Sequence, residues 1–228
     1  MDSAQLLDHL DGLIKSRSIL CHPFYLAWER GELSRGQLAT YARVYYPHVA
    51  AFPGHLQTAM QRTVDPQVRD ELSRNLTDER TEPAPHHELW LDFAEAMGED
   101  RFVVAAASPH PAAVNMIASF RRLAERDTAS ALAAFYTYES QQPEVSLRKM
   151  EGLREHYGVS EEKGLAYFEV HARMDREHRQ GERAALGRCL DAGATAASVL
   201  GAADDALRAY WALLDGICAE GGIAIAEA

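Results

Sequence analysis

Apolar residues recur along almost the whole chain at intervals of three and four, which is the spacing of one helix face. The strict apolar–polar alternation of strands, flanked by Asn-Gly or Asp-Gly turns, is absent from the sequence. One predicted helix begins at Ser34, and another, which carries His171, begins at Ser160. The others cover roughly residues 66–80, 86–97, 111–125, 128–141, 144–158 and 195–217. We therefore expect one all-α domain over residues 1–228, built as a bundle of seven or eight helices.

Capping and helix-breaking residues set the boundaries of these helices. Ser34-Arg-Gly-Gln37 has the form of a capping box and predicts a helix start there. Pro23 and Pro53 are expected to divide the first third of the chain. Pro83 and Pro85 separate the helix that ends near residue 80 from the one that begins at residue 86. The sequence thus predicts a joint between those two helices.

The segment from His171 to His178 carries the strongest chemical pattern in the chain. His171, Asp175 and His178 are offset by four and seven residues, so a helix would point all three side chains from one face. Phe168 and Ala172 lie on the same face, which is therefore apolar. Two imidazoles and a carboxylate are costly in a core unless something binds them. Iron, manganese and zinc all accept this ligand set, so we interpret the triplet as half of a metal site.

Two further segments supply candidate ligands for the other half. Glu79 and His86 flank the proline-containing joint, and Glu139 lies just before Pro143. Together with the triplet, these residues make three carboxylates and three imidazoles. Such a set would hold two metal ions about 3.5–4 Å apart and leave positions open for dioxygen. The sequence alone does not establish that the segments converge.

Other metal and nucleotide motifs are missing. Ferritin-like dimetal bundles carry two Glu-x-x-His motifs, whereas only Asp175 and His178 have a comparable spacing in this chain. The zinc-protease pattern His-Glu-x-x-His is absent as well. Neither a Gly-x-Gly-x-x-Gly sequence nor a phosphate-binding Walker loop occurs. These absences weaken the ferritin-like interpretation and give nucleotide binding no support.

Composition narrows the class of protein further. The formal net charge of −11 argues against nonspecific binding to nucleic acid or to an anionic membrane. The three cysteines are scattered and form no Cys-x-x-Cys pair, which does not suggest a disulfide framework or a zinc knuckle. We find no signal peptide and no apolar run of about 18 residues. A cytoplasmic protein without a nucleic-acid or membrane partner is expected.

Seven segments, in order and at the expected spacing, resemble the heme-oxygenase-like dimetal oxidases. Among these enzymes, the chain is most similar to the CADD-like branch, which is implicated in making para-aminobenzoate for folate. The matching segments are His22-Pro-Phe-Tyr-Leu-Ala-Trp28, Tyr45-Tyr-Pro-His-Val-Ala-Ala-Phe-Pro53, Asn75-Leu-Thr-Asp-Glu79, His86-His-Glu-Leu-Trp90, Tyr138-Glu-Ser-Gln-Gln-Pro-Glu-Val145, Lys149-Met-Glu-Gly-Leu-Arg-Glu-His-Tyr-Gly158 and Phe168-Glu-Val-His-Ala-Arg-Met-Asp-Arg-Glu-His178.

The resemblance implies a heme-oxygenase-like bundle that holds iron with iron or manganese. It implies dioxygen and an external reductant as co-substrates, and it leaves a homodimer open. The metal ligands that it implies are Glu79, His86, Glu139, His171, Asp175 and His178. In this branch the enzyme is thought to be its own substrate, with a tyrosine as the ring source and a lysine as the nitrogen source. Tyr25 and Lys149 match those roles, and Tyr41, Tyr138 and Tyr167 are further aromatic residues expected around the site.

Two alternatives share parts of this interpretation. A dimetal oxidase could act on an external small molecule, by amine N-oxygenation or fatty-acid decarboxylation, with the same ligands. A metal-free helical binding module would need none of them. The pairing of Tyr25 with Lys149 is the feature that favours synthesis of para-aminobenzoate over both.

Overall fold

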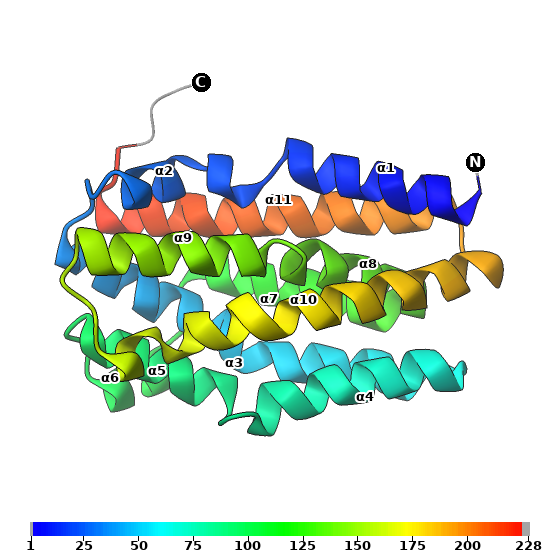
Figure 1. Cartoon of the computed structure of the whole chain (residues 1–228), viewed down its shortest axis with the longest axis horizontal. Helices are drawn as coiled ribbons and strands as arrows, with labels where there is room; N and C mark the ends of the chain where they lie inside the picture. The colour runs from blue at the N-terminus through cyan, green and yellow to red at the C-terminus, as the bar shows by residue number, and fades with distance from the viewer. Residues whose placement is uncertain (1, 225–228) are drawn as a thin grey trace.

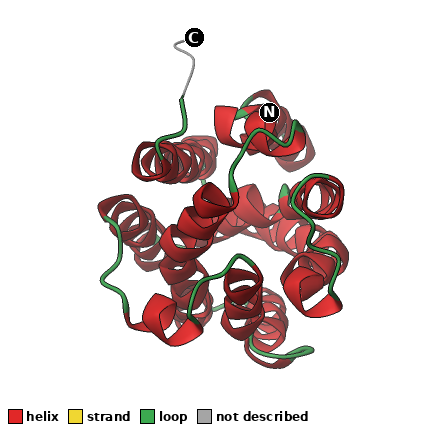
Figure 2. Ribbon diagram, turned by 90° about the vertical axis from the view of Figure 1, so that its left-hand side faces the viewer, coloured by secondary structure: helices red, strands yellow, loops and turns green. Residues whose placement is uncertain are grey.

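The computed structural model describes residues 2–224, and all regular structure within that range is helical (Figures 1 and 2). The elements are α1 (Ser3–Ser16), the 3₁₀ turn η1 (Ile19–Cys21), α2 (Pro23–Glu29), α3 (Arg35–Arg62), α4 (Pro66–Thr81), α5 (His86–Ala96), α6 (Arg101–Ala106), α7 (Pro111–Arg126), α8 (Thr128–Glu139), α9 (Gln142–Glu155), α10 (Glu162–Asp191) and α11 (Ala196–Gly221). The all-α prediction is confirmed. The number of helices exceeds the seven or eight expected, partly because α2 and α6 are single short segments of seven and six residues.

The longest helices run along the length of the bundle and form its frame (Figure 1). Helix α10 packs against α5, α8 and α9, while α3 packs against α4, α5 and α7. Helix α8 lies in the interior, where every residue from Ala129 to Glu139 is buried. The last residue of α8 is Glu139, so the chain delivers a carboxylate into the core at the point where the helix ends.

Side-chain caps begin most of these helices. The Ser34 side chain accepts a hydrogen bond from the backbone N–H of Gln37, and the Gln37 side-chain oxygen accepts one from the backbone N–H of Ser34. The predicted capping box is therefore present. Pro53 does not divide the first third of the chain as expected, because it and Pro47 both lie inside α3. A proline removes one helix hydrogen bond. Buried residues, Tyr41 among them, recur along α3 from Leu38 to Ala59. Their packing against neighbouring helices keeps α3 continuous through both prolines.

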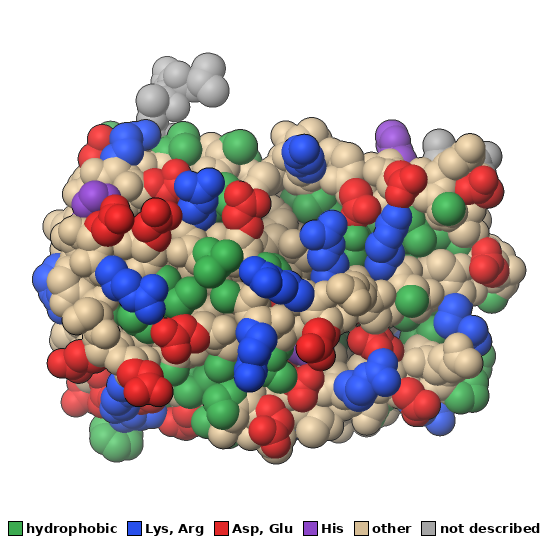
Figure 3. All heavy atoms as spheres, in the orientation of Figure 1, with side chains coloured by type: hydrophobic (Ala, Val, Ile, Leu, Met, Phe, Trp, Pro, Cys, Tyr) green, Lys and Arg blue, Asp and Glu red, His purple; other side chains and the backbone are tan. Residues whose placement is uncertain are grey.

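The surface of the molecule is charged and mixed in sign. Figure 3 shows acidic and basic side chains interspersed over one face of the molecule. Within residues 2–224, no helix has both the length and the apolar character that crossing a bilayer requires.

Close packing around Trp28 predicts that Gly152→Ala destabilises the protein. A Cβ at Gly152 would lie 2.7 Å from the ring of Trp28, whose side chain is fully buried. We expect a loss of about 1–3 kcal/mol in the free energy of unfolding, measured by urea denaturation. Gly12→Ala is the matched control, because a Cβ there meets nothing within 4 Å inside α1. It should raise stability by about 0.5–1 kcal/mol, and an equal effect of both changes would contradict the packing argument.

Candidate metal centre

The first of two buried ligand clusters brings together Glu79, His86 and His171. Glu79 lies near the end of α4, His86 is the first residue of α5, and His171 lies on α10. The His86 Nδ1 and His171 Nε2 atoms are 3.1 and 3.7 Å from Glu79 Oε1. The predicted joint between α4 and α5 therefore places a carboxylate and an imidazole side by side. His87 remains partly exposed and lies 3.4 Å from Glu88, which leaves His86 as the inward-facing histidine.

The second cluster consists of Glu139, Asp175 and His178. The His178 Nδ1 atom is 3.4 Å from Asp175 Oδ1 and 3.7 Å from Glu139 Oε2. Helix α10 supplies residues to both clusters, with His171 directed to the first and Asp175 and His178 to the second. The structure thus brings the six predicted ligands into two groups of three. Helix α10 contributes one residue to the first group and two to the second.

The ligand sets fit a metal at both clusters. Each offers carboxylate oxygen and imidazole nitrogen, which suit iron and manganese. All six residues are at most 5% exposed. Among the described residues, the buried Asp175 Oδ2 atom has no hydrogen-bond partner, and His86 Nδ1 and His178 Nδ1 lie near carboxylate oxygens of their own clusters without hydrogen-bond geometry. Buried polar atoms without partners cost free energy, so a cation bound by each cluster would account for their retention.

A second contact fixes the orientation of each histidine ring. The ring nitrogen that does not face the cluster contacts a backbone or carboxylate oxygen in all three cases. These contacts are His86 Nε2 with Glu82 O at 3.1 Å, His171 Nδ1 with Tyr167 O at 2.7 Å, and His178 Nε2 with Asp78 Oδ2 at 2.9 Å. Such contacts hold the proton on the outer nitrogen and direct the lone pair of the inner one toward a metal.

Protonation differs between the two clusters. Burial raises the pKa of Glu139 to about 8, although the neighbouring His178 acts in the opposite direction. For Glu79, burial is outweighed by His86 and His171, and its pKa lies below the ordinary value. Burial would lower the pKa of His178, but Asp175, Glu139 and Asp78 together raise it to about 10. Without metal, the second cluster therefore holds protons at positions that a cation would occupy.

Two residues that sequence reasoning missed surround the second cluster. The Asn75 Nδ2 atom donates to both carboxylate oxygens of Glu139, at 3.0 and 2.9 Å. It also lies 3.5 Å from Oε1 of Glu182, which is fully buried. Burial, followed by repulsion from Glu139, raises the pKa of Glu182. Glu182 follows His178 by four residues, so the helical spacing that revealed the triplet also places Glu182 on its face.

An aromatic chamber adjoins the first cluster. Tyr167 stacks on His171 with ring centroids 4.0 Å apart, and Trp90 contacts Tyr167 at 4.7 Å. Tyr41 contacts Trp90 at 5.4 Å on the other side. The Tyr41 hydroxyl lies 3.4 Å from that of Tyr25. Ring contacts thus run without a break from the first cluster to the neighbours of Tyr25.

Lys149 projects into the same chamber and is only 1% exposed. Its Nζ donates to the Tyr41 hydroxyl at 2.6 Å and lies 5.2 Å from the ring centroid of Tyr25. No carboxylate within 4 Å pairs with it in the described part of the chain. Burial holds the pKa of Lys149 well below its ordinary value, which favours the neutral amine. The structure therefore brings Tyr25, Tyr41 and Lys149 together as a group.

Tyr138 belongs to a hydroxyl network that adjoins this group through Tyr210, which contacts the Tyr25 hydroxyl. The Tyr45 hydroxyl lies 2.9 Å from the hydroxyls of both Tyr138 and Tyr210. Gln142 donates to Tyr210 at 3.1 Å. Tyr210, which sequence reasoning missed, comes from α11, far along the chain from the motifs. Its place in an Ala- and Leu-rich helix gave no signal in the sequence.

Loss of the Asn75 amide is expected to weaken metal binding at the second cluster alone. Asn75→Ala leaves Glu139 without two hydrogen bonds and should lower metal affinity about 10- to 100-fold there. Titration with Fe(II) or Mn(II), followed by metal analysis, should show one tight equivalent and one weakened equivalent. Ser73→Ala, an exposed change on the same helix, should retain two equal equivalents. Unaltered stoichiometry and affinity in Asn75→Ala would contradict this role.

The chain is similar in sequence to a family of redox enzymes and to several named synthases. A family described as iron-containing redox enzymes matches residues 39–211. A 4-aminobenzoate synthase of Chlamydia trachomatis is 36% identical over 92% of this chain and 90% of its own length. A protein of the same name from Nitrosomonas europaea is 35% identical, over 91% and 89%. A pyrroloquinoline-quinone synthase of Granulibacter bethesdensis is 30% identical over 64% of this chain and 59% of its own.

Solved structures share the fold at lower identity. A TenA homologue from Pseudomonas syringae superposes with a TM-score of 0.80 at 18% identity, covering 95% of this chain and 93% of the homologue. A CADD-like protein from Nostoc punctiforme superposes with a TM-score of 0.74 at 17% identity, covering 99% of both chains. The chain belongs to the iron-containing redox enzymes with a heme-oxygenase-like fold.

Proposed function

We propose that this protein is a 4-aminobenzoate synthase that builds its product from its own side chains, with Tyr25 as the ring source and Lys149 as the nitrogen source. Relatives named 4-aminobenzoate synthase match nine-tenths of the chain, which supports the product. The observation that carries the assignment of residues is the contact geometry of Lys149. Its amine lies 5.2 Å from the ring of Tyr25 and is buried with that ring in one chamber.

The chemistry of the product fits these two side chains. A tyrosine side chain already contains a para-substituted ring with one attached carbon, Cβ. To give 4-aminobenzoate, the Cα–Cβ bond must break, with Cα left on the backbone, and Cβ must be oxidised to a carboxylate. The phenol oxygen must leave as water, and the Cε–Nζ bond of Lys149 must break as nitrogen passes to the ring, with Cε oxidised and hydrolysed to an aldehyde. The oxidising equivalents come from dioxygen with an external reductant. A neutral buried amine retains the lone pair that an ammonium lacks, so Lys149 can supply the nitrogen.

Iron in the two clusters, alone or with manganese, would supply oxidation by dioxygen when bound. Glu79, His86 and His171 would hold one ion, and Glu139, Asp175 and His178 the other. The chamber itself excludes water, because Tyr25, Tyr41 and Lys149 are each no more than 1% exposed. Tyr41 accepts a hydrogen bond from Lys149 and lies beside the Tyr25 hydroxyl, so it can pass a proton between them.

Removal of the Tyr25 hydroxyl should abolish formation of 4-aminobenzoate. Tyr25→Phe keeps the ring packing and loses only hydroxyl contacts with Tyr41 and Tyr210, so metal content and folding should remain unchanged. The metal-loaded variant is incubated with oxygen and reductant, and product is measured by mass spectrometry. Tyr46→Phe is the matched control on α3, outside the chamber, and should retain full yield. A normal yield from Tyr25→Phe would show that another residue or an external molecule supplies the ring.

Replacement of the buried Lys149 amine should raise the free energy of unfolding while abolishing product formation. Lys149→Met removes a group whose folded pKa lies well below its ordinary value of 10.5. Between those two values the unfolded state binds more protons, so wild-type stability falls as pH decreases. We expect Lys149→Met to be more stable by about 1 kcal/mol or more at pH 6.5 and by less at pH 9.5. Urea denaturation at both pH values measures this difference.

The same variant should yield no 4-aminobenzoate with both metals bound. Lys163→Met, an exposed change, serves as the control and should leave product formation intact. Full activity of Lys149→Met would remove the lysine from the reaction and direct the search to an external nitrogen donor.

A further inference from the structure

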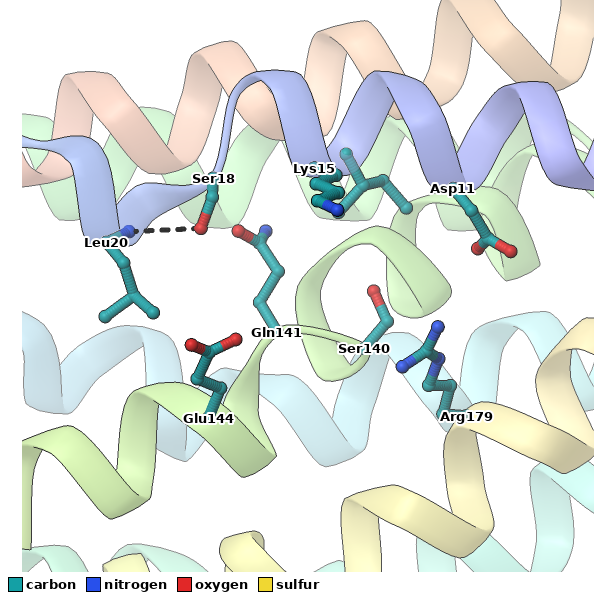
Figure 4. Close-up of a pocket in the computed structure, with 9 residues that line it drawn as sticks. Asp11, Lys15, Ser18, Leu20, Ser140, Gln141, Glu144 and Arg179 are labelled. Atoms are coloured by element: carbon teal, nitrogen blue, oxygen red, sulfur yellow. Dashed lines mark hydrogen bonds between the residues drawn. The ribbon is translucent and has the colours of Figure 1, made fainter.

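A pocket of about 260 Å³ lies between the end of α1, η1, the α8–α9 junction and α10 (Figure 4). Its floor is the junction of α8 and α9, where Ser140 follows Glu139 directly. Arg179, which follows His178, enters it from α10. The opposite wall comes from the end of α1 and from η1, the segment that leads into Tyr25 on α2. Two lining residues, Ser140 and Arg179, are thus the chain neighbours of Glu139 and His178 in the second cluster, and the wall formed by η1 leads into the helix that carries Tyr25.

The pocket contains cations without acidic partners. Neither Lys15 nor Arg179 has a carboxylate within 4 Å among residues 2–224. Asp11, the acid at this end, is already engaged by the Tyr136 hydroxyl and by Arg183 at 3.4 Å. Figure 4 shows Arg179 projecting into the pocket beneath the helix that carries Lys15. An anionic group would therefore find positive charge that is not neutralised within the protein.

A buried hydroxyl provides an independent indication of a ligand. The Ser140 Oγ atom is shielded from solvent and has no hydrogen-bond partner in the described structure. In Figure 4 it points from the α8–α9 junction toward the space between Arg179 and Lys15. A guanidinium, an ammonium and a hydroxyl together match the oxygens of one carboxylate.

The rest of the lining suits a compact aromatic skeleton. Ile14 and Leu20 provide apolar contact surface in the wall formed by α1 and η1. Glu144 lines the pocket from α9, across from Arg179 (Figure 4). Its carboxylate is exposed at the rim, 3.9 Å from Arg148, and can accept a hydrogen bond from an amine there. A volume of about 260 Å³ lies just below the usual range of roughly 300–1,000 Å³ for small-ligand sites, so only a small ligand fits.

We propose that this pocket binds a small aromatic carboxylate and that its occupant is 4-aminobenzoate. The carboxylate lies against Arg179, Lys15 and Ser140, the ring packs on Ile14 and Leu20, and the amine faces Glu144. The identity of the occupant rests on the proposed function, whereas the carboxylate site follows from the lining alone. The product would thus be held against residues that follow Glu139 and His178 directly in the chain.

Equilibrium binding of 4-aminobenzoate to the metal-loaded protein tests the site. Isothermal titration calorimetry is performed without oxygen or reductant, so that no synthesis is required. Arg179→Gln and Lys15→Gln should each weaken binding about tenfold, since each removes one charge-assisted contact. Arg176→Gln, an exposed change one turn earlier on α10, is the matched control and should leave affinity unchanged. Absence of binding to the wild type, or unchanged binding to the Lys15→Gln, Arg179→Gln double variant, would overturn the proposal.

Ligand analogues test the two ends of the pocket. Benzoate should bind and lose affinity in Arg179→Gln, whereas aniline, without a carboxylate, should not bind. Glu144→Gln should reduce the preference for 4-aminobenzoate over benzoate. Equal binding of aniline and benzoate would overturn the carboxylate assignment. Binding by a protein that makes no product would refute the proposed function and leave the carboxylate site, whereas synthesis without binding would refute only the pocket.

Discussion

The burial of six ionisable side chains, the candidate metal ligands, in the interior of a helical bundle is the constraint on which the rest of the structure depends. Three carboxylates and three imidazoles are at most 5% exposed, and several of their polar atoms lack a protein partner. Isolated buried charges cost several kcal/mol each, so this core requires bound cations or protons to be stable. Burial raises the pKa of Glu139, and nearby carboxylates raise the pKa of His178, so both side chains favour the protonated form without a cation.

The fold meets this constraint by building both clusters on α10 and by fixing each ligand from outside. Helix α8 ends at Glu139, the α4–α5 joint places Glu79 beside His86, and Asn75 holds both oxygens of Glu139. The aromatic chamber beside the clusters differs from them, because its buried ionisable group has no partner of opposite charge. Lys149 is buried against aromatic faces and one hydroxyl rather than against a carboxylate, so its charge is not supported. The fold thus gives up stability to keep a neutral amine beside a phenol.

Helical spacing made part of this centre predictable from sequence. His171, Asp175 and His178 share one face by periodicity alone, and the joint at Pro83 and Pro85 lies where expected. Convergence of Glu79, His86 and Glu139 depended on the resemblance to known oxidases, since contacts between helices are not local. Tyr210 was missed because its α11 position becomes meaningful only after packing, and Pro53 was misread because tertiary contacts keep α3 continuous. Glu182 was within reach, as the fourth member of the α10 face.

The origin of the product ring is the central claim, and isotopic labelling tests it most directly. Protein produced with ring-¹³C-labelled tyrosine is loaded with iron and manganese, then exposed to oxygen and reductant in the presence of excess unlabelled tyrosine. The account predicts fully ring-labelled 4-aminobenzoate, with a matching loss of the side chain at Tyr25 in the digested protein. Unlabelled product, or labelled product with Tyr25 intact, would contradict it.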